Sequence, residues 1–139
     1  MKNDRYTEIG DNVEDYTNTN SIGPQTAMAI AGLSDHKFRL GAVVVKNRRV
    51  LSASSNMNKT SGFYCKHFPI SKIDKLHAEA RAVLRARMNL NGAKIFIARR
   101  TASGFGLARP CIICWSILCE AGIKEVVYTT QNGWSREKI

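Results

Sequence analysis

Two short motifs about thirty residues apart constrain the fold of this chain more than any other feature. The first is His77-Ala78-Glu79, and the second is Pro110-Cys111-Ile112-Ile113-Cys114. Two cysteines three positions apart share one face of a helix. In the first turn of that helix, the N–H groups and the helix dipole favour the thiolate, which is the form that binds metal.

Together the motifs supply three metal-ligating side chains, His77, Cys111 and Cys114, and one free carboxylate, Glu79. Three protein ligands leave the fourth position of a tetrahedral zinc ion open for water, which then ionises near neutral pH. A structural zinc site would normally have four protein ligands. The pattern therefore predicts a hydrolytic metal site in which Glu79 moves protons.

Each of these residues has an ordinary interpretation when it is considered alone. His77 could be a core or surface histidine, and the two cysteines could be small buried hydrophobic residues. Glu79 could be a carboxylate that the start of a helix stabilises, which does not compete with catalysis. The combination of His77 and Glu79 with a Cys-x-x-Cys that follows a proline favours the metal site.

Hydrophobic periodicity and turn residues predict that helices and strands alternate along the chain. Pro24 suits the first turn of a helix that runs to Leu33. The other expected helices are 74–88, with Asp74 as N-cap, and 110–121, ended by Gly122. The expected strands are 41–45 and 50–54, joined by a hairpin turn at 46–49, and then 93–98 and 125–129. Residues 56–74 and 101–109 are expected to be loops and 131–139 a polar tail.

The pair H-x-E and P-C-x-x-C resembles the signature of the zinc-dependent cytidine, deoxycytidylate and tRNA adenosine deaminase superfamily. The resemblance extends over roughly Gly41 to Thr130, and it implies bound Zn²⁺ and a homo-oligomer. His77 as the first ligand is typical of the deoxycytidylate, tRNA-adenosine and APOBEC-type branch. Strand–helix–strand crossovers make the later strands parallel. The fold expected is therefore α/β, a three-layer α/β/α arrangement with a mixed central sheet.

The resemblance also implies substrate contacts. The amide of Ala78 would bind the pyrimidine carbonyl, and the carbonyl of Pro110 would accept from the exocyclic amine. Asn56 stands where relatives place an asparagine that contacts the sugar or phosphate side of the nucleotide. The alternative is a turn asparagine at a strand end, and the substrate role is favoured over it. Ser54 replaces a family glycine beside it, which could alter how Asn56 is presented.

The function expected from these residues is hydrolytic conversion of a cytosine base to uracil, in a free nucleotide or nucleoside such as dCMP. Glu79 would take the proton of the attacking water and deliver protons to N3 and the leaving amine. The small size and the long loop before the His motif resemble phage-type deoxycytidylate deaminases. One alternative is editing of adenosine or cytosine within RNA or single-stranded DNA. Another is a basic, non-catalytic zinc protein that binds nucleic acid, which would not need Glu79.

Charge and composition bear on partners and location. The formal charge is +10, but residues 1–23 hold two basic and five acidic side chains and the rest therefore carries +13. Such a basic body favours anionic partners, either nucleotides or nucleic acid, or is simply a solvated surface. We expect a polar arm over 1–23 and one deaminase domain over 24–139. No long apolar run and no signal peptide are seen, so no membrane contact and a cytoplasmic location are expected, with action in a host cytoplasm if the protein is phage-encoded.

Other candidates carry weaker signals. The segment Phe63–Phe68 mixes aromatic and basic residues, which suits base stacking or phosphate binding, or a packed loop. Cys65 and His67 in it are expected on the surface or lining a pocket, and Cys119 in the core. Arginine forks bind phosphate, but on so basic a chain each of a cluster of three is expected to be solvated: Arg99, Arg100 and Arg109.

Overall fold

The structure is a computed structural model that describes residues 6–8, 22–34, 38–60, 75–86, 88–102 and 104–139. Its helices are α2 (Ile22–Ala31), α4 (Ala78–Ala86) and α5 (Ile112–Ala121). Its strands are β1 (Tyr6–Glu8), β2 (Arg39–Lys46), β3 (Arg49–Ser55), β4 (Met57–Thr60), β5 (Lys75–Leu76), β6 (Lys94–Thr101), β7 (Gly104–Gly106), β8 (Glu125–Thr130) and β9 (Gly133–Lys138).

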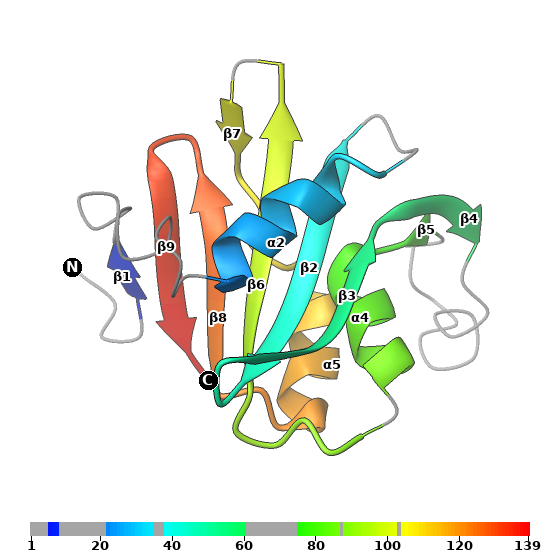
Figure 1. Cartoon of the computed structure of the whole chain (residues 1–139), viewed down its shortest axis with the longest axis vertical. Coiled ribbons are helices and arrows are strands. Elements are labelled where there is room, and N and C mark those ends of the chain that lie inside the picture. The colour runs from blue at the N-terminus through cyan, green and yellow to red at the C-terminus, as the bar shows by residue number, and fades with distance from the viewer. Residues whose placement is uncertain (1–5, 9–21, 35–37, 61–74, 87, 103) are drawn as a thin grey trace.

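Seven of the described strands form one sheet, in the order β1-β9-β8-β6-β2-β3, with β7 paired to β6. Strands β6 and β8 are parallel and are joined through α5, while the other pairs are antiparallel. Helix α2 lies on one face of the sheet, and α4 and α5 lie on the other (Figure 1). The predicted three-layer α/β/α fold with a mixed sheet is confirmed.

Alternate residues of the central strands feed two separate cores. Ile95 and Ile97 of β6 belong to the core under α4 and α5, whereas Phe96 and Ala98 belong to the core under α2. This is the period of two expected for a strand covered on both faces. On the α2 side the helix approaches closely, because a Cβ at Gly41 would meet backbone atoms of α2 at 2.3 and 2.4 Å. Only glycine fits at that point.

Local signals explain where α5 and the first hairpin begin and end. Cys111 is the N-cap of α5, and Gly122 ends the helix in the left-handed region, with φ of 84°. The β2–β3 hairpin turns at Asn47 and Arg48, whose φ values of 53° and 63° suit a two-residue hairpin loop. The predicted hairpin and the predicted stop at Gly122 are confirmed, while α5 starts two residues after Pro110.

The sequence interpretation was wrong at several places. Residues 133–138 form β9, which pairs with β8, so most of the expected polar tail is a strand. Helix α4 begins at Ala78, because Lys75 and Leu76 pair with β4 instead; Asp74 lies outside the described residues. Within the loop expected at 101–109, β7 pairs with β6.

In the polar arm expected over 1–23, Tyr6–Glu8 form β1 and dock against β9.

A bilayer-crossing element was not expected from the sequence. Within the described part of the chain, no helix has the length and apolar character that crossing a membrane demands.

Candidate metal centre and acid–base site

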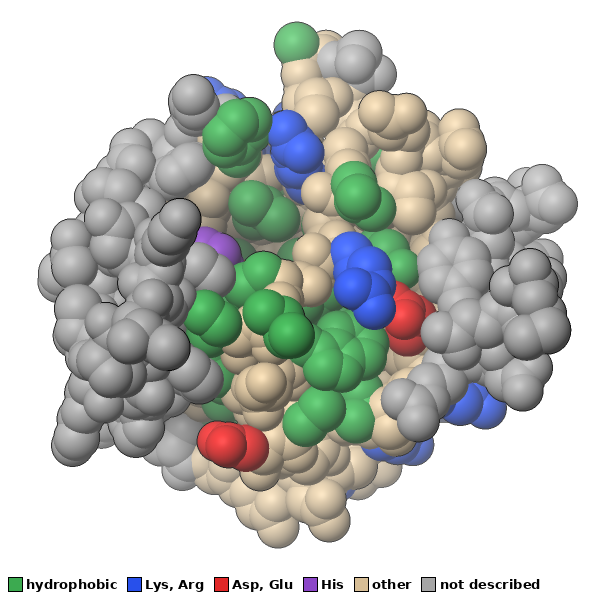
Figure 2. All heavy atoms as spheres, turned by 180° about the vertical axis from the view of Figure 1, so that it is seen from behind, with side chains coloured by type: hydrophobic (Ala, Val, Ile, Leu, Met, Phe, Trp, Pro, Cys, Tyr) green, Lys and Arg blue, Asp and Glu red, His purple; other side chains and the backbone are tan. Residues whose placement is uncertain are grey.

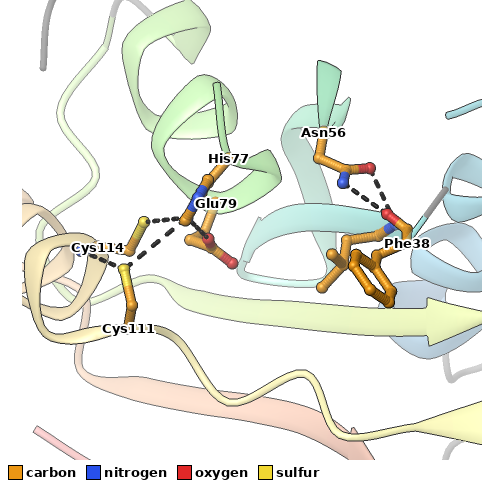
Figure 3. A network of polar contacts seen from close by, with 7 residues as sticks. Phe38, Asn56, His77, Glu79, Cys111 and Cys114 are labelled. Carbon is orange, nitrogen blue, oxygen red and sulfur yellow. Dashed lines mark hydrogen bonds and ion pairs between the residues drawn. The ribbon is translucent and has the colours of Figure 1, made fainter. Parts of the chain in front are cut away.

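The two sequence motifs meet at the N-terminal ends of α4 and α5. His77 directly precedes α4, and its carbonyl accepts from the amide of Arg81, the first hydrogen bond of that helix. Cys111 caps α5, and Cys114 lies in its first turn. The Nδ1 atom of His77 lies 3.3 Å from Sγ of Cys114 and 3.8 Å from Sγ of Cys111 (Figure 3). All three donor atoms lie within 4.8 Å of one another.

This donor set fits a zinc ion. Zinc–nitrogen and zinc–sulfur bonds of about 2.0 and 2.3 Å at tetrahedral angles place neighbouring donors roughly 3.5–3.8 Å apart. The two measured nitrogen–sulfur separations, 3.3 and 3.8 Å, bracket that range. One imidazole and two thiolates are ligands that zinc prefers, and three of them leave a coordination position for water. The predicted ligands are therefore brought together.

A lowered pKa gives Cys111 its metal-binding thiolate form, whereas a raised pKa keeps on His77 a proton that metal binding must displace. The side chain of Cys114 lowers the pKa of the Cys111 thiol to about 4, with help from His77 and against the effect of burial. Hydrogen bonds with Cys111 and Glu79 raise the pKa of His77 to about 10, although burial opposes this. A proton on His77 thus balances the Cys111 thiolate, and a cation bound between them would replace that proton.

Glu79 lies beside the three ligands without belonging to the convergent set. It is the second residue of α4, and only 4% of it is exposed. Its Oε1 atom lies 3.5 Å from Nδ1 of His77. Figure 3 shows its carboxylate close to His77 and pointing away from the two sulfur atoms. A carboxylate in this position can exchange protons with a group held at the metal position.

The two backbone groups expected to contact substrate border the same place. Ala78 is the first residue of α4 and is buried. Its N–H belongs to the first turn, where helical amides have no acceptor within the helix. Pro110 is buried and immediately precedes the N-cap Cys111. Both residues adjoin ligands in the chain, so their backbone groups are positioned by the same two helix starts.

Asn56 belongs to a second network. Its Oδ1 accepts from the amide of Leu40 at 3.0 Å and from the hydroxyl of Ser34, and its Nδ2 donates to the carbonyl of Phe38 at 2.6 Å. In Figure 3 this group lies apart from the cluster at His77. Asn56 therefore ties Ser34, after α2, to Phe38 and Leu40 at the start of β2. Sequence reasoning missed Ser34 and Phe38, since no local pattern links them to a residue about twenty positions away.

A third polar group stands behind the cysteine loop. Arg109 donates from Nε to Oε2 of Glu137 at 2.6 Å and from Nη2 to Oε1 at 3.1 Å, and Tyr128 donates to Oε2 at 2.9 Å. The Arg109 guanidinium also lies 5.0 Å from the centre of the Trp115 ring. Arg109 is half exposed, and its bonds to Glu137 tie the residue before Pro110 to β9.

The remaining candidates divide as follows. Cys119 is exposed on α5, so its expected place in the core was wrong. The segment Phe63–Phe68, with Cys65 and His67, lies outside the described residues. Arg99 and Arg100 follow one another on β6 and therefore face opposite sides of the sheet.

Comparison with known proteins agrees with this geometry. Residues 21–130 match the family described as "Cytidine and deoxycytidylate deaminase zinc-binding region". The deoxycytidylate deaminase of Mycobacterium phage D29 is 29% identical over 124 residues, which cover 76% of this chain and 90% of that protein.

Solved structures of the dCMP deaminase from cyanophage S-TIM5 have a similar fold. The apo form has a TM-score of 0.58 and 26% identity, and the match covers 80% of this chain and 82% of that chain. The form in complex with dCMP and dUMP has a TM-score of 0.54 and 28% identity, and the match covers 75% of each chain. With its His-Cys-Cys cluster and the match over residues 21–130, the chain belongs to the cytidine and deoxycytidylate deaminase family.

Proposed function

We propose that this protein is a zinc-dependent hydrolase that converts cytosine to uracil in a free nucleotide such as dCMP. The observation that carries the proposal is the convergence of His77, Cys111 and Cys114 beside a buried carboxylate, Glu79, that is not a member of the ligand set. Pure metal binding does not need that carboxylate. The similarity to dCMP deaminases supports a deoxycytidylate substrate.

The reaction adds water at C4 of the base and releases ammonia, so one C–O bond forms and one C–N bond breaks. When bound, zinc supplies the Lewis acidity that lowers the pKa of water toward neutrality. Glu79 accepts the proton that the attacking water loses and passes protons to N3 and to the departing amine. Burial of Glu79 keeps bulk water from competing for those protons.

The chain's own backbone orients the base. In this proposal the free N–H of Ala78, at the start of α4, donates to the pyrimidine carbonyl. The carbonyl of Pro110, beside the N-cap of α5, accepts from the exocyclic amine. Because both groups are set by the helix starts that also carry the ligands, the base and the metal position share one rigid frame.

Asn56 enters the proposal as a neighbour of the sugar. Its Oδ1 is occupied by Leu40 and Ser34, so only the second hydrogen of Nδ2 remains for a ligand. The preceding residue is tied to α4, since Nη1 of Arg81 donates to the carbonyl of Ser55 at 3.1 Å. Asn56 therefore sets the position of the loop near the sugar more than it supplies contacts itself.

A substrate panel tests the function. We expect ammonia release from dCMP or a related cytosine nucleotide, with wild-type protein loaded with zinc. Adenosine nucleotides and single-stranded oligonucleotides serve as comparison substrates, and the mass of each product identifies the base that changed. Deamination within oligonucleotides without any turnover of cytosine nucleotides would replace this proposal with nucleic-acid editing.

The basic charge favours nucleic acid as a second ligand of this protein. Outside residues 1–23 the chain carries +13, and such a surface attracts phosphates without sequence preference. We expect oligonucleotide binding to weaken steeply as salt rises, without deamination. Binding and turnover therefore have to be measured separately.

A homo-oligomer remains a proposal drawn from the resemblance. Ile112 at the start of α5 is 82% exposed, and it is an apolar side chain that contact with a second copy would cover. Ile112→Glu should lower the sedimentation coefficient of the wild-type assembly, whereas identical sedimentation would remove α5 from the interface. The phage relative also fits the expected action in a host cytoplasm.

A further inference from the structure

A cavity of about 360 Å³ opens near the C-terminal end of β6. Its walls are Arg99, Thr101, Phe105, Gly106, Leu107 and Gln131. These residues come from β6, from β7 and the segment after it, and from the β8–β9 turn. Its volume falls within the range typical of small-ligand sites. Among the described residues of the wall, the guanidinium of Arg99 carries the only formal charge.

The cavity opens on the face of the sheet that carries α4 and α5. Ile95 and Ile97 pack in the core beneath those helices, and Arg99 is two residues farther along the same strand. Figure 2 views the molecule from this side. Hydrophobic side chains gather in the middle of this view, with a few basic side chains beside them. The cavity and the metal centre therefore share one face.

Arg99 is held in place by an aromatic ring, and none of the ion pairs between described residues includes it. Its Cζ lies 4.8 Å from the centre of the Phe38 ring, an arrangement that leaves the edge of the guanidinium for hydrogen bonds. Its Nε is buried and has no hydrogen-bond partner within the described part of the chain. A buried N–H of this kind costs free energy unless a ligand satisfies it. The arrangement fits a bound anion.

Gly106 makes room for this conformation. A Cβ at that position would lie 2.9 Å from Cδ and 3.1 Å from Nε of Arg99. The backbone is in turn fixed, because the hydroxyl of Thr129 donates to the carbonyl of Gly106 at 2.7 Å and accepts from the amide of Arg99 at 2.9 Å. The absence of a side chain at Gly106 of β7 thus leaves room for the Arg99 side chain of β6.

The cavity is close to the metal centre along the chain and is linked to Asn56 through Phe38. Leu107 lines it, and Cys111 follows four positions later, a separation of at most about 14 Å even for extended chain. On the other side, Phe38 holds Arg99 through its ring and Asn56 through its carbonyl. A nucleotide with its base at the metal centre would thus direct its sugar past Asn56 and its phosphate toward Arg99.

We propose that Arg99 binds the 5′-phosphate of the substrate nucleotide and so makes the enzyme prefer nucleoside monophosphates to nucleosides. This inference rests on the proposed function for the placement of the base. Thr101 and Gln131 offer further polar groups at the cavity wall. Arginine is suited to this role, because its planar fork can donate two hydrogen bonds to one phosphate.

Arg100 is a matched control. It follows Arg99 on β6 and carries the same charge, but its Nη1 lies beside Gly32, at the end of α2 on the opposite face. Arg99→Met should lower kcat/KM for dCMP on the order of 10–100-fold, the effect of losing hydrogen bonds to a charged group. Turnover of deoxycytidine should change by less than about threefold in the same variant, and Arg100→Met should leave the ratio of the two substrates unchanged.

Two further variants separate charge from geometry. Arg99→Lys keeps the charge but loses the fork, so it should recover only part of the preference for dCMP. Gly106→Ala keeps Arg99 but displaces its stem, so it should lower the preference as well. Circular dichroism and thermal melting of each variant show whether the fold is intact, and a folded Arg99→Met protein with the wild-type substrate ratio would overturn the proposal.

A binding experiment distinguishes failure of this proposal from failure of the proposed function. Calorimetry measures the affinities of dUMP, deoxyuridine and a single-stranded oligonucleotide for wild type and Arg99→Met. We expect Arg99→Met to weaken dUMP by 10-fold or more and deoxyuridine hardly at all. Equal dUMP affinities, or an effect confined to the oligonucleotide, would overturn the phosphate assignment. Selective loss of dUMP binding without any deamination by wild type would sustain the phosphate site and reject the proposed function.

Discussion

Glu79 and Glu137 are equally buried, with 4% of each residue exposed, yet their surroundings differ in kind. Glu137 accepts two hydrogen bonds from Arg109 and one from Tyr128, at 2.6 to 3.1 Å. Glu79 has one charged neighbour among the described residues, His77, at 3.5 Å. Glu137 is bound by Arg109, which lies two residues before Cys111. Glu79 lies in the first turn of α4, beside His77.

The difference shows how hydrogen-bond saturation separates a structural carboxylate from one able to react. An ionised carboxylate only accepts hydrogen bonds, and three short donors leave Glu137 little capacity for another partner. Burial without such donors is costly for Glu79 unless a ligand or a metal-held group supplies them. We therefore assign the proton transfer to Glu79 and the stability of the β8–β9 region to Glu137.

The largest expected effect follows from removing a metal ligand beside Glu79. Cys111→Ala should abolish tight zinc binding and lose more turnover than any change at either carboxylate, because two ligands remain of three. Elemental analysis after dialysis against a weak chelator measures the zinc. Cys119→Ala is the control, since Cys119 is an exposed cysteine on the same helix. Full, tightly held zinc in Cys111→Ala would show that the ion binds elsewhere.

Exchanging each carboxylate for its amide tests the comparison directly. Glu79→Gln should retain zinc and lose about 10²–10⁴-fold in kcat, the usual contribution of general acid–base catalysis. Glu137→Gln should keep kcat within a few-fold of wild type. Steady-state ammonia release by zinc-loaded proteins gives both values. Comparable losses in the two variants would mean that saturation does not distinguish the two roles.

The convergence of His77, Cys111 and Cys114 was predictable from the sequence, because residue types at fixed local spacing indicate it. His77 and Glu79 are two positions apart, and Cys111 and Cys114 are three apart. At the start of a helix, such short spacing fixes how the side chains of each motif lie relative to one another. The mixed sheet followed from the strand–helix–strand order in the same way. These features depend on short-range geometry that a sequence displays.

The polar networks were not predictable, because their members are distant along the chain. Glu137 lies 28 residues from Arg109, and the segment that holds it was interpreted as a polar tail. A signal was present in Asn132-Gly133, a common hairpin turn, but the charged residues after it concealed the strand. Asn56 was placed correctly at a strand end, whereas its bonds to Ser34 and Phe38 depend on the tertiary fold.

The acid stability of the protein should report on Glu137. Burial raises the pKa of this carboxyl, but hydrogen bonds from Arg109 and Tyr128 and the charge of Arg109 outweigh it and lower the pKa below the ordinary 4.5. A lowered pKa in the folded state stabilises the protein above about 4.5, and this contribution is lost as pH falls through the folded value.

Glu137→Gln should therefore cost about 1–3 kcal/mol in the free energy of unfolding at pH 7, since the amide cannot replace the ion pair. The difference from wild type should shrink between pH 5 and pH 3, roughly the window below the ordinary carboxyl pKa. Denaturant unfolding across that range measures it. Glu120→Gln is the control, because Glu120 is exposed on α5. A constant difference at every pH would mean that Glu137 is not ionised in the native state.

The smallest effect on stability is expected at Asn56, where no charge is buried. Asn56→Ala removes the acceptor for the Leu40 amide and the donor for the Phe38 carbonyl, which should cost about 1–2 kcal/mol. Zinc content should stay unchanged, since Asn56 makes no contact with the three ligands in the described part of the chain. Because Phe38 also holds Arg99, the loss should extend to substrate choice and reduce kcat/KM for dCMP more than for deoxycytidine.

Ser34→Ala removes one donor to the same Oδ1 while leaving the Phe38 bond, so it should lower stability without changing the substrate ratio. An unchanged ratio in Asn56→Ala would separate this network from the phosphate site and leave Asn56 with a purely structural role.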